Sequence, residues 1–387
     1  MPQASARRVS AVQDRLGVVA TLARVLAVEA LFWLSLAALL WTHAGYPAVA
    51  SALARVRRRD LGADDYEPMV AVIVAAHDED AVIGRRVANL QALDYPAGKL
   101  QVVVTSDAST DRTEELAAAA GARVIKNPRG GKVAAQDRAV RETNSEIVAF
   151  SDANATWAPD ALRRLIRNFA DPEVAYVCGQ LTLLDADGGN QEGVYWRYEL
   201  ATRAAESQLM SITGGNGAIY AVRRADYVEV DPRFGHDLSL PYLMVQRGRR
   251  AIYEPDALAF EKPTPSNETE YRRKVRMFEH CWLIVLRGRM LRGQPVGYAV
   301  ELVSHRHLRY ASGLLHLMLL GASIALVTHG WIYDAVLAAQ LALLLAAALG
   351  VGIARYYVLV TSATVVALWN YLRRGVPATW AAPEGTR

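Results

Sequence analysis

Polar side chains follow three short apolar runs in the middle of the sequence, at positions where they could bind a cation and a phosphate ester. In chain order they are His77, Glu79, Asp107, Asp152 and Asn154. Carboxylate and amide oxygens are the ligands that Mg²⁺ and Mn²⁺ prefer. Asp and Asn are also common in turns, so any one of them alone would indicate only a turn or a helix cap. Three carboxylates after three apolar runs favour a metal- and phosphate-binding site.

The apolar runs have the length and composition of buried strands. They cover residues 70–76, 100–106, 123–126 and 146–151, with helical patterns between them such as residues 132–141. A short continuous apolar run is typical of a strand that is covered on both faces. Strands that alternate with helices indicate an α/β fold with a mainly parallel sheet. Because ligands of such sheets bind beyond the carboxyl ends of the strands, we expect the polar residues to share one rim.

The composition excludes a disordered chain and gives little support to nucleic-acid binding. Hydrophobic residues make up 52% of the 387 residues and the formal net charge is +4, whereas disorder requires low hydrophobicity and high net charge. No basic stripe is interleaved with aromatic residues. Cys178 and Cys281 are too few for a disulfide framework, and free thiols are expected. Neither a P-loop motif nor a G-x-G-x-x-G motif occurs, which removes support for those nucleotide sites.

The longest apolar stretches lie toward the two ends of the chain. Residues 25–54 contain Glu29 as their single formal charge, and about twenty apolar residues span a bilayer as a helix. A cleaved signal peptide is the alternative, but the stretch is too long for a signal core and a basic cluster follows it directly. Three further candidate spans lie at about 308–328, 331–350 and 354–372. The sequence therefore predicts a soluble domain carried by N- and C-terminal transmembrane helices.

The order of the motifs resembles that of family 2 glycosyltransferases, the inverting nucleotide-sugar enzymes of the GT-A fold. The resemblance covers about residues 66–290, and it is most specific in DASTDRT (107–113), which fits the family's D-x-S-x-D-x-T segment. SDAN (151–154) stands at the place of the D-x-D metal motif. HD (236–237) stands at the place of the family's E-D or D-D base, and RKVRM (273–277) at that of its Q-x-x-R-W motif.

The resemblance implies a donor side that binds a nucleoside diphosphate sugar, most often one of uridine. Asp107 would hydrogen-bond the nucleotide base with support from Glu79, and Lys132 would stabilise the diphosphate. Asp152 and Asn154 would face a Mg²⁺ or Mn²⁺ ion, which neutralises charge on the leaving diphosphate. The implied nucleotide-sugar ligands are Ala75, His77, Glu79, Asp107, Lys132 and Asp152.

The same resemblance implies an acceptor side with a general base. Asp237 would remove the proton of the acceptor hydroxyl, and Arg276 would help to stabilise the diphosphate while a single displacement inverts the anomeric carbon. From spacing alone, Asp237 could instead cap a helix, and the glycines of 214–217 could form a plain tight turn. The residues expected along the acceptor path are Gly215, Asn216 and Trp196.

Three positions depart from the family pattern. Asn154 replaces the second Asp of D-x-D, which removes a negative charge from the metal site but keeps a carbonyl ligand. His236 stands beside the expected base in place of an acid, where a protonated imidazole would favour the ionised carboxylate. Residues 273–277 lack the Gln and Trp that accompany processive synthesis in the family. Elsewhere, His305 and His307 have the spacing of a metal pair, but we expect them to be interfacial helix residues.

Together these features predict a membrane-anchored, metal-dependent glycosyltransferase. Its expected partners are a nucleotide-diphosphate-sugar donor, a lipid-linked or polysaccharide acceptor and membrane lipids, with no nucleic acid. We expect its catalytic domain on the cytoplasmic side of a bacterial inner (plasma) membrane. A membrane-bound nucleotidyltransferase and a catalytically degenerate sugar-binding or scaffold subunit stay open as alternatives. The expected segments are an N-terminal segment with one span (1–60), the catalytic domain (61–265), membrane-interface helices (266–307) and a C-terminal transmembrane region with a tail (308–387).

Overall fold

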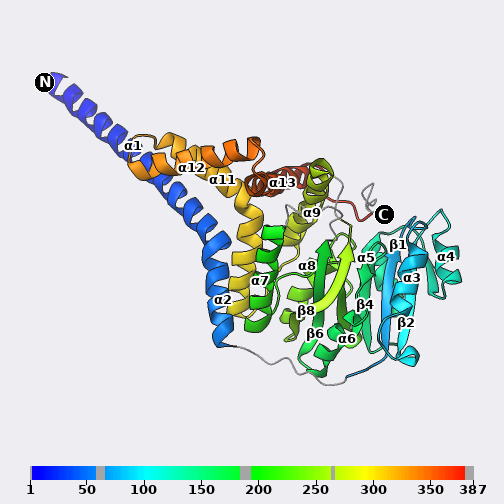
Figure 1. Ribbon diagram of the computed structural model, residues 1–387. Coiled ribbons are helices and arrows are strands. Elements are labelled where there is room, and N and C mark those ends of the chain that lie inside the picture. The colour runs from blue at the N-terminus through cyan, green and yellow to red at the C-terminus, as the bar shows by residue number, and fades with distance from the viewer. Residues whose placement is uncertain (1, 58–65, 184–192, 263–265, 380–387) are drawn as a thin grey trace.

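A single sheet forms the centre of the protein, and helices cover both of its faces (Figure 1). The computed structural model describes residues 2–57, 66–183, 193–262 and 266–379. Within these residues the sheet has eight strands in the order β3-β2-β1-β4-β7-β6-β8-β5. The strands are β1 Val70–Ala76, β2 Leu100–Asp107, β3 Arg123–Asn127, β4 Ile147–Asp152, β5 Thr156–Trp157, β6 Val174–Leu183, β7 Tyr220–Arg223 and β8 Arg250–Glu261.

The predicted α/β fold is confirmed, and the four apolar runs of the sequence are strands β1 to β4. These four pair in parallel, with β1 between β2 and β4. The other half of the sheet is mixed, because β7 runs antiparallel between β4 and β6, and β5 runs antiparallel to β8. Strands β6 and β8 are parallel. The parallel half brings the carboxyl ends of β1, β2 and β4 to one rim, as the sequence predicts.

Helices of the central domain cover both faces of the sheet because the side chains of β1 alternate between two apolar clusters. Val70, Val72 and Val74 pack on one face, and Ala71 and Ile73 on the other. The first face carries α3 Ile83–Gln91, α4 Thr113–Ala119 and α6 Ala161–Ile166, and the second carries α5 Lys132–Arg141, α7 Gly193–Leu209 and α8 His236–Gln246. Short 3₁₀ turns lie at Ala97–Lys99, Arg167–Ala170 and Arg224–Asp226.

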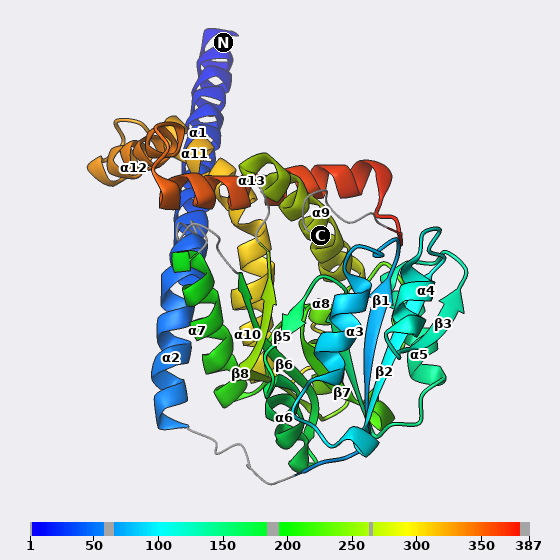
Figure 2. The same ribbon diagram turned by 45° about the vertical axis from the view of Figure 1, so that its right-hand side comes forward.

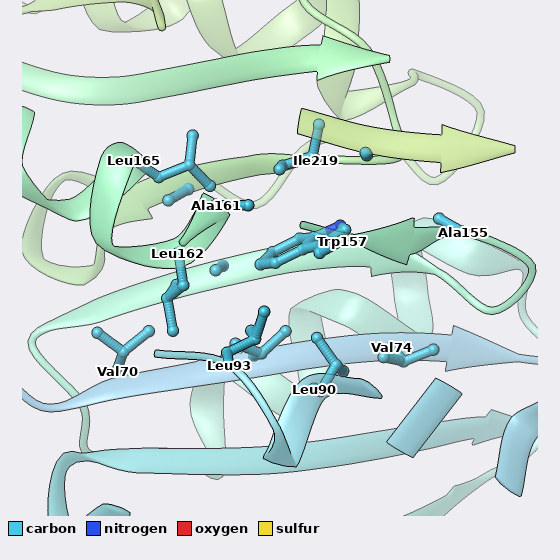
Figure 3. Packing of buried hydrophobic residues seen from close by; sticks show 14 of the residues in the cluster. Val70, Val74, Leu90, Leu93, Ala155, Trp157, Ala161, Leu162, Leu165 and Ile219 are labelled. Carbon is cyan, nitrogen blue, oxygen red and sulfur yellow. The ribbon is translucent and has the colours of Figure 1, made fainter. Parts of the chain in front are cut away.

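Trp157 fills the centre of the first apolar cluster. Figure 3 shows its ring among Leu90, Leu162 and Ile219. The side chain is 1% exposed, and its indole nitrogen donates to the carbonyl oxygen of Ala218 at 2.9 Å. Its ring therefore joins α3 and α6 to the middle of the sheet.

Long apolar helices lie along one side of the domain (Figures 1 and 2). Within the part of the chain that the structure describes, four segments are long and apolar enough to cross a membrane: Val19–Val56, Val296–Ala325, Trp331–Ala348 and Gly352–Arg374. They agree with the four predicted spans. The helices are α1 Pro2–Leu40, a π-helical turn at Trp41–Gly45, α2 Tyr46–Val56, α9 Asn267–Arg287, α10 Val296–Glu301, a second π-helical turn at Leu302–His307, α11 Leu308–Ala325, α12 Trp331–Ala348 and α13 Gly352–Arg374.

The apolar helices attach to the domain at two places. Helix α1 packs against α11 through Phe32 and Leu319, whereas α2 continues along α7 of the central domain through Tyr46 and Ala205. Helix α13 lies over α9 (Figure 2), where Trp282 donates to the carbonyl oxygen of Thr364 at 2.9 Å. The cavity described below lies between these attachments.

Replacement of Trp157 by Ala should destabilise the central domain strongly. The lost packing and the cavity left behind are worth about 3 kcal/mol or more, which corresponds to a fall of about 6–12 °C in the midpoint of thermal unfolding for a domain of this size. The measurement is a thermal melt of the detergent-purified protein. Trp369→Ala is the matched control, because Trp369 is 58% exposed and its loss should change the midpoint little. Equal effects of the two substitutions would contradict the prediction.

Candidate active site

One cavity of about 840 Å³ lies beyond the carboxyl ends of β1, β2 and β4, and it extends to α9, α11 and α13. All the residues that the sequence assigns to the site line this cavity. They are Ala75, His77, Glu79, Asp107, Lys132, Asp152, Asn154, Trp196, Gly215, Asn216, Asp237 and Arg276. Among the described lining residues, ten Lys or Arg stand against seven Asp or Glu. The cavity therefore has the charge that an anionic ligand requires.

The carboxylate of Asp107 holds the loop that follows β3. It accepts hydrogen bonds from the backbone N–H of Gly130 at 2.7 Å and of Gly131 at 3.0 Å, and from the guanidinium of Arg129 at 2.7 Å. The Asp107 side chain is only 5% exposed. This loop is thus drawn over the end of β2, beside the position expected for a nucleotide base.

The other residues of the 107–113 segment tie the loops after β1 and β2 together. Asp78 accepts from the backbone N–H of Thr110 at 2.7 Å, and its own N–H donates to Ser109 at 3.2 Å. The N–H of Glu79 donates to the hydroxyl of Thr113 at 2.7 Å. Asp78 adopts a left-handed backbone with φ of 52°, which Asp tolerates better than most residues. The motif therefore sets where Glu79 stands in the cavity.

Lys132 and Asp152 form an ion pair across the rim. The Lys132 ammonium contacts Asp152 Oδ1. Burial opposes the charge of Lys132, but the Asp152 carboxylate outweighs burial and raises the lysine's pKa. Gly131 precedes the lysine with φ of +92°, and a Cβ there would lie 2.3 Å from the carbonyl oxygen of Ala378. The chain after α13 thus packs directly on the start of α5.

The rim fits a divalent cation that is shared with a substrate. Asp152 offers a carboxylate and Asn154 an amide carbonyl, which are suitable donors for Mg²⁺ or Mn²⁺. No three His, Cys, Asp or Glu side chains in the described part of the chain gather closely enough to hold a metal ion alone. Mg²⁺ is usually bound in this manner, through one or two carboxylates together with substrate phosphates and water.

Glu261 is a carboxyl group of the site that the sequence reasoning missed. It ends β8 and lines the cavity. Burial, and then the nearby charge of Asp152, raise its pKa to about 7. One of its oxygens, Oε1, has no hydrogen-bond partner in the described residues. No sequence signal marked it, because the apolar and polar residues of β8 do not follow a simple pattern.

Asp237 lies in the first turn of α8 rather than at its N-cap, which is Gly235. Its backbone carbonyl accepts from the N–H of Gly215 at 2.6 Å. Both ring nitrogens of His236 face tyrosine hydroxyls, Tyr220 at 2.9 Å and Tyr227 at 3.2 Å. The hydrogen bonds of the imidazole therefore go to these tyrosines, and the carboxylate of Asp137 lies 3.7 Å from its Nε2.

The loop at 214–217 is shaped by its neighbours. Asn216 donates to the carbonyl oxygen of Gly179 at 2.7 Å and accepts from the N–H groups of Ala218 and Ile219 at 3.1 and 3.0 Å. Its amide is thus used within the protein and fixes the loop. A Cβ at Gly215 would lie 2.2 Å from the hydroxyl of Tyr176, so only glycine fits there.

Trp196 and Arg276 line the cavity from two different helices. Trp196 lies on α7 and donates from its indole nitrogen to the carbonyl oxygen of Leu181 at 2.9 Å. Arg276 lies on α9, where burial and then the neighbouring Arg273 lower its pKa. Arg273 itself pairs with Glu270 one turn earlier at 2.7 Å. Helix α9 therefore presents cations to the cavity.

A buried polar cluster joins α7 to the second π-helical turn, and the sequence reasoning did not find it. His305 contacts Glu206 at 2.6 Å and Glu199 at 3.1 Å. Burial opposes the charge of Glu199, but His305 and Arg309 outweigh it and hold the pKa of Glu199 well below its usual value. The expectation of an interfacial His305 without acidic partners is wrong, because its partners lie about a hundred residues earlier on α7. His305 is fully buried.

The comparisons with known proteins bear on the central domain. The family model described as Glycosyl transferase family 2 matches residues 71–230. The chain carries a family 2 glycosyltransferase domain. The matched residues include β1 to β4, β7 and every donor-side residue named above, whereas Asp237 and Arg276 lie beyond them.

Curated relatives of this glycosyltransferase domain come from bacteria. The beta-monoglucosyldiacylglycerol synthase of Synechocystis sp. is 33% identical over 164 residues, which cover 39% of this chain and 33% of the relative. The N-acetylglucosaminyltransferase of Rhizobium meliloti is 30% identical over 219 residues, or 49% of this chain and 50% of the relative. The chain thus spans a third to a half of the length of these relatives.

A solved structure resembles the whole arrangement of domain and helices. The mannosyltransferase PcManGT from Pyrobaculum calidifontis, in complex with GDP-Man and Mn²⁺, superposes with a TM-score of 0.70 at 24% identity. The match covers 89% of this chain and 99% of that one. The family 2 glycosyltransferase domain and its apolar helices therefore share one overall fold with that protein.

Glu261 should make the stability of the metal-free protein depend on pH. Its folded pKa, about 7, lies above the ordinary value of 4.5, so its favourable contribution is full below about pH 4.5 and is lost as pH rises through 7. Glu261→Gln should therefore have a free energy of unfolding above that of the wild type by about 3 kcal/mol at pH 8.5, with a higher melting temperature, and the difference should be smaller at pH 5.5. Thermal melts in chelator test this. Glu268→Gln, at an exposed site, is the control; a pH-independent difference for Glu261→Gln would contradict the prediction.

Proposed function

We propose that this protein is a metal-dependent, inverting glycosyltransferase that moves a sugar from a nucleoside diphosphate, of uridine in the first instance, to a lipid-linked or polysaccharide acceptor at a membrane. One observation carries the proposal: a single cavity unites the Asp107 loop, the Lys132–Asp152 pair, Asp237 and Arg276. Each part corresponds to one step that sugar transfer requires. The proposed location is the cytoplasmic face of a bacterial inner membrane.

The donor would lie along the rim of the parallel half of the sheet. Asp107, with Arg129 and Glu79 beside it, would hold the nucleotide base. Lys132 would pair with the diphosphate, and its contact with Asp152 would weaken accordingly. Asp152 and Asn154 would hold Mg²⁺ or Mn²⁺, which neutralises the charge that develops on the leaving diphosphate. Arg276 would add a planar fork of donors on the opposite side.

The acceptor would enter between α7, the glycine-rich loop and α8. Asp237 would accept the proton of the acceptor hydroxyl at a carboxylate oxygen as that hydroxyl attacks the anomeric carbon. A single displacement from the face opposite the leaving group inverts that carbon. Asn216 and Gly215 would set the backbone of the loop, and Trp196 would offer an aromatic face to the acceptor.

A membrane acceptor is favoured because the cavity continues into the apolar helices. Its lining includes Tyr310 of α11 and Tyr356, Val360 and Thr361 of α13, and both helices belong to candidate spans. An acceptor with an alkyl chain could therefore reach Asp237 without leaving the membrane surface.

Asp237→Asn should lower turnover by about 10²–10⁴-fold, the usual contribution of a general base. Nucleotide binding should persist, because Asp237 does not face the donor side in the proposal. The assay is release of nucleoside diphosphate by detergent-purified protein with a bacterial lipid extract, screened over uridine- and guanosine-diphosphate sugars with Mn²⁺, Mg²⁺ or chelator. Asp256→Asn is the matched control, since Asp256 is exposed on β8 outside the cavity. Full turnover by Asp237→Asn would reject the assigned base.

Asn154→Asp should restore a second carboxylate and lower the Mn²⁺ concentration needed for half-maximal activity by about threefold to tenfold, through added attraction to the cation. Asn154→Ala and Asp152→Ala should shift this concentration the other way. Mn²⁺ titrations of nucleotide binding and of turnover measure both. An unchanged Mn²⁺ requirement in all three variants would place the cation elsewhere.

A further inference from the structure

Two buried arginines line the cavity near Gly214, at one end of the glycine-rich loop formed by residues 214–217. Lys132 lies near the other end of this loop, at Gly217. Arg203 on α7 is 3% exposed, and Arg306 in the second π-helical turn is 8% exposed. Three of their nitrogens, Nε and Nη1 of Arg203 and Nη2 of Arg306, have no hydrogen-bond partner among the described residues. We refer to them as the Arg203–Arg306 pair. Polar groups buried to this degree are almost always hydrogen-bonded.

Surrounding contacts hold both guanidinium groups in place. Arg203 donates to the carbonyl oxygen of Gly215 at 3.4 Å, and its guanidinium carbon lies 5.7 Å from the ring centroid of Tyr253. Arg306 donates from Nε to the hydroxyl of Thr213 at 3.0 Å. Because these contacts fix the planes of the groups, the remaining N–H donors are pre-oriented.

The positive charge here exceeds the carboxylates that face it. Glu199 pairs with Arg306 at 3.5 Å and with Arg203 at 3.9 Å, and it also contacts Arg309 and His305. One carboxylate is thus shared by three guanidinium groups and a histidine. Glu206 is a second carboxylate near Arg306, and it also bonds Tyr46, Thr213 and His305. Glu301, although buried, does not line the cavity. Three guanidinium groups thus face two carboxylates. An uncompensated buried charge is costly, which favours an anionic ligand.

The Arg203–Arg306 pair lies on the acceptor side of the loop. A Cβ at Gly214 would lie 2.8 Å from Arg306 Nη2, whereas a Cβ at Gly217 would lie 3.1 Å from Lys132 Nζ. Three residues of chain span at most about 11 Å, so the α-carbons of Gly214 and Gly217 lie within about that distance of each other. Between the two ends, Gly215 bonds the backbone of Asp237.

We propose that the Arg203–Arg306 pair binds the phosphate group of a lipid-phosphate acceptor. Guanidinium forks match phosphate oxygens in geometry and charge. The alkyl chain of such an acceptor would pass along Tyr310, Tyr356 and Val360, which line the same cavity from candidate membrane helices. This inference rests on the proposed function, because it names the acceptor class of that same site.

The test compares three probes on the full-length protein in a maltoside detergent with saturating UDP and Mn²⁺. Decyl phosphate carries the proposed chemistry, 1-decanol has the same chain without the charge, and inorganic phosphate has the charge without the chain. Dissociation constants are measured by thermophoresis, and UDP binding is measured separately on every protein. Decyl phosphate should bind at least about tenfold more tightly than either other probe.

Four variants locate the anion. Arg306→Gln removes one fork, and Gly214→Ala displaces it sterically while keeping every charge; each should weaken decyl phosphate about tenfold or more, the scale of a lost charged hydrogen bond. Gly214→Ala decides the matter if Arg306→Gln does not fold, because its added methyl meets the end of a flexible side chain. Arg355→Gln, at an exposed position of α13 outside the cavity, and Lys132→Gln, at the donor rim, should leave decyl phosphate binding unchanged.

Distinct results would overturn the inference. Equal affinity for 1-decanol would show that the site takes a neutral acceptor, and equal affinity for inorganic phosphate would show that no lipid is recognised. Weakening by Lys132→Gln but not by Arg306→Gln or Gly214→Ala would place the probe at the donor rim. Failure of the wild type to bind UDP would count against the proposed function but not against the anion site, since the decyl phosphate affinities of the variants are read independently.

Discussion

The hydrogen bonds accepted by Asp107 are the constraint on which the donor half of the cavity depends. Its carboxylate fixes the N–H groups of Gly130 and Gly131 and the side chain of Arg129, and these residues lead directly into α5. Lys132 is the first residue of that helix. The position of the lysine opposite Asp152 thus follows from a carboxylate at the end of a different strand. The parallel pairing of β1, β2 and β4 brings these strand ends together. The hydrogen bonds of Asp107 then fix the loop before α5, and with it the position of Lys132.

Much of this half could be predicted from the sequence because the interactions that form it are local. The apolar runs of β1 to β4 and the helix at 132–141 emerge from their hydrophobic pattern, since each buries side chains on known faces. The 107–113 segment supplies its own turn and capping groups, so its place after β2 could be predicted as well. What these residues do for one another, such as the contact of Asp78 with the Thr110 backbone, becomes visible only when two loops about thirty residues apart are placed side by side.

The rest depends on pairings between distant segments. Strands β5 and β7 are two and four residues long, too short to show a pattern, and their antiparallel pairing is decided by the sheet around them. His305 was expected to be an interfacial helix residue because its partners, Glu199 and Glu206, lie on a helix about a hundred residues earlier in the sequence. Glu261 was missed because β8, which it ends, shows no simple pattern of apolar and polar residues. Buried charge clusters leave no periodic trace, whereas apolar faces do.

The long N-terminal helix would fix the distance of the cavity from the membrane as well as anchor the protein there. The segment Val19–Val56 has 38 residues, about 57 Å at 1.5 Å per residue, nearly twice the hydrocarbon thickness of a bilayer. Its α2 part is joined to the central domain, where Tyr46 donates to Glu206 at 2.8 Å. Its π-helical turn is joined to the second π-helical turn, where Trp41 donates to Ser304 at 2.8 Å. With its N-terminal part in the bilayer, this helix would set the height of the cavity above the membrane. The enzyme would then reach acceptors whose head groups lie at one distance from the bilayer. Lipids whose head groups lie at another distance would be excluded by position alone, without direct contacts to distinguish them.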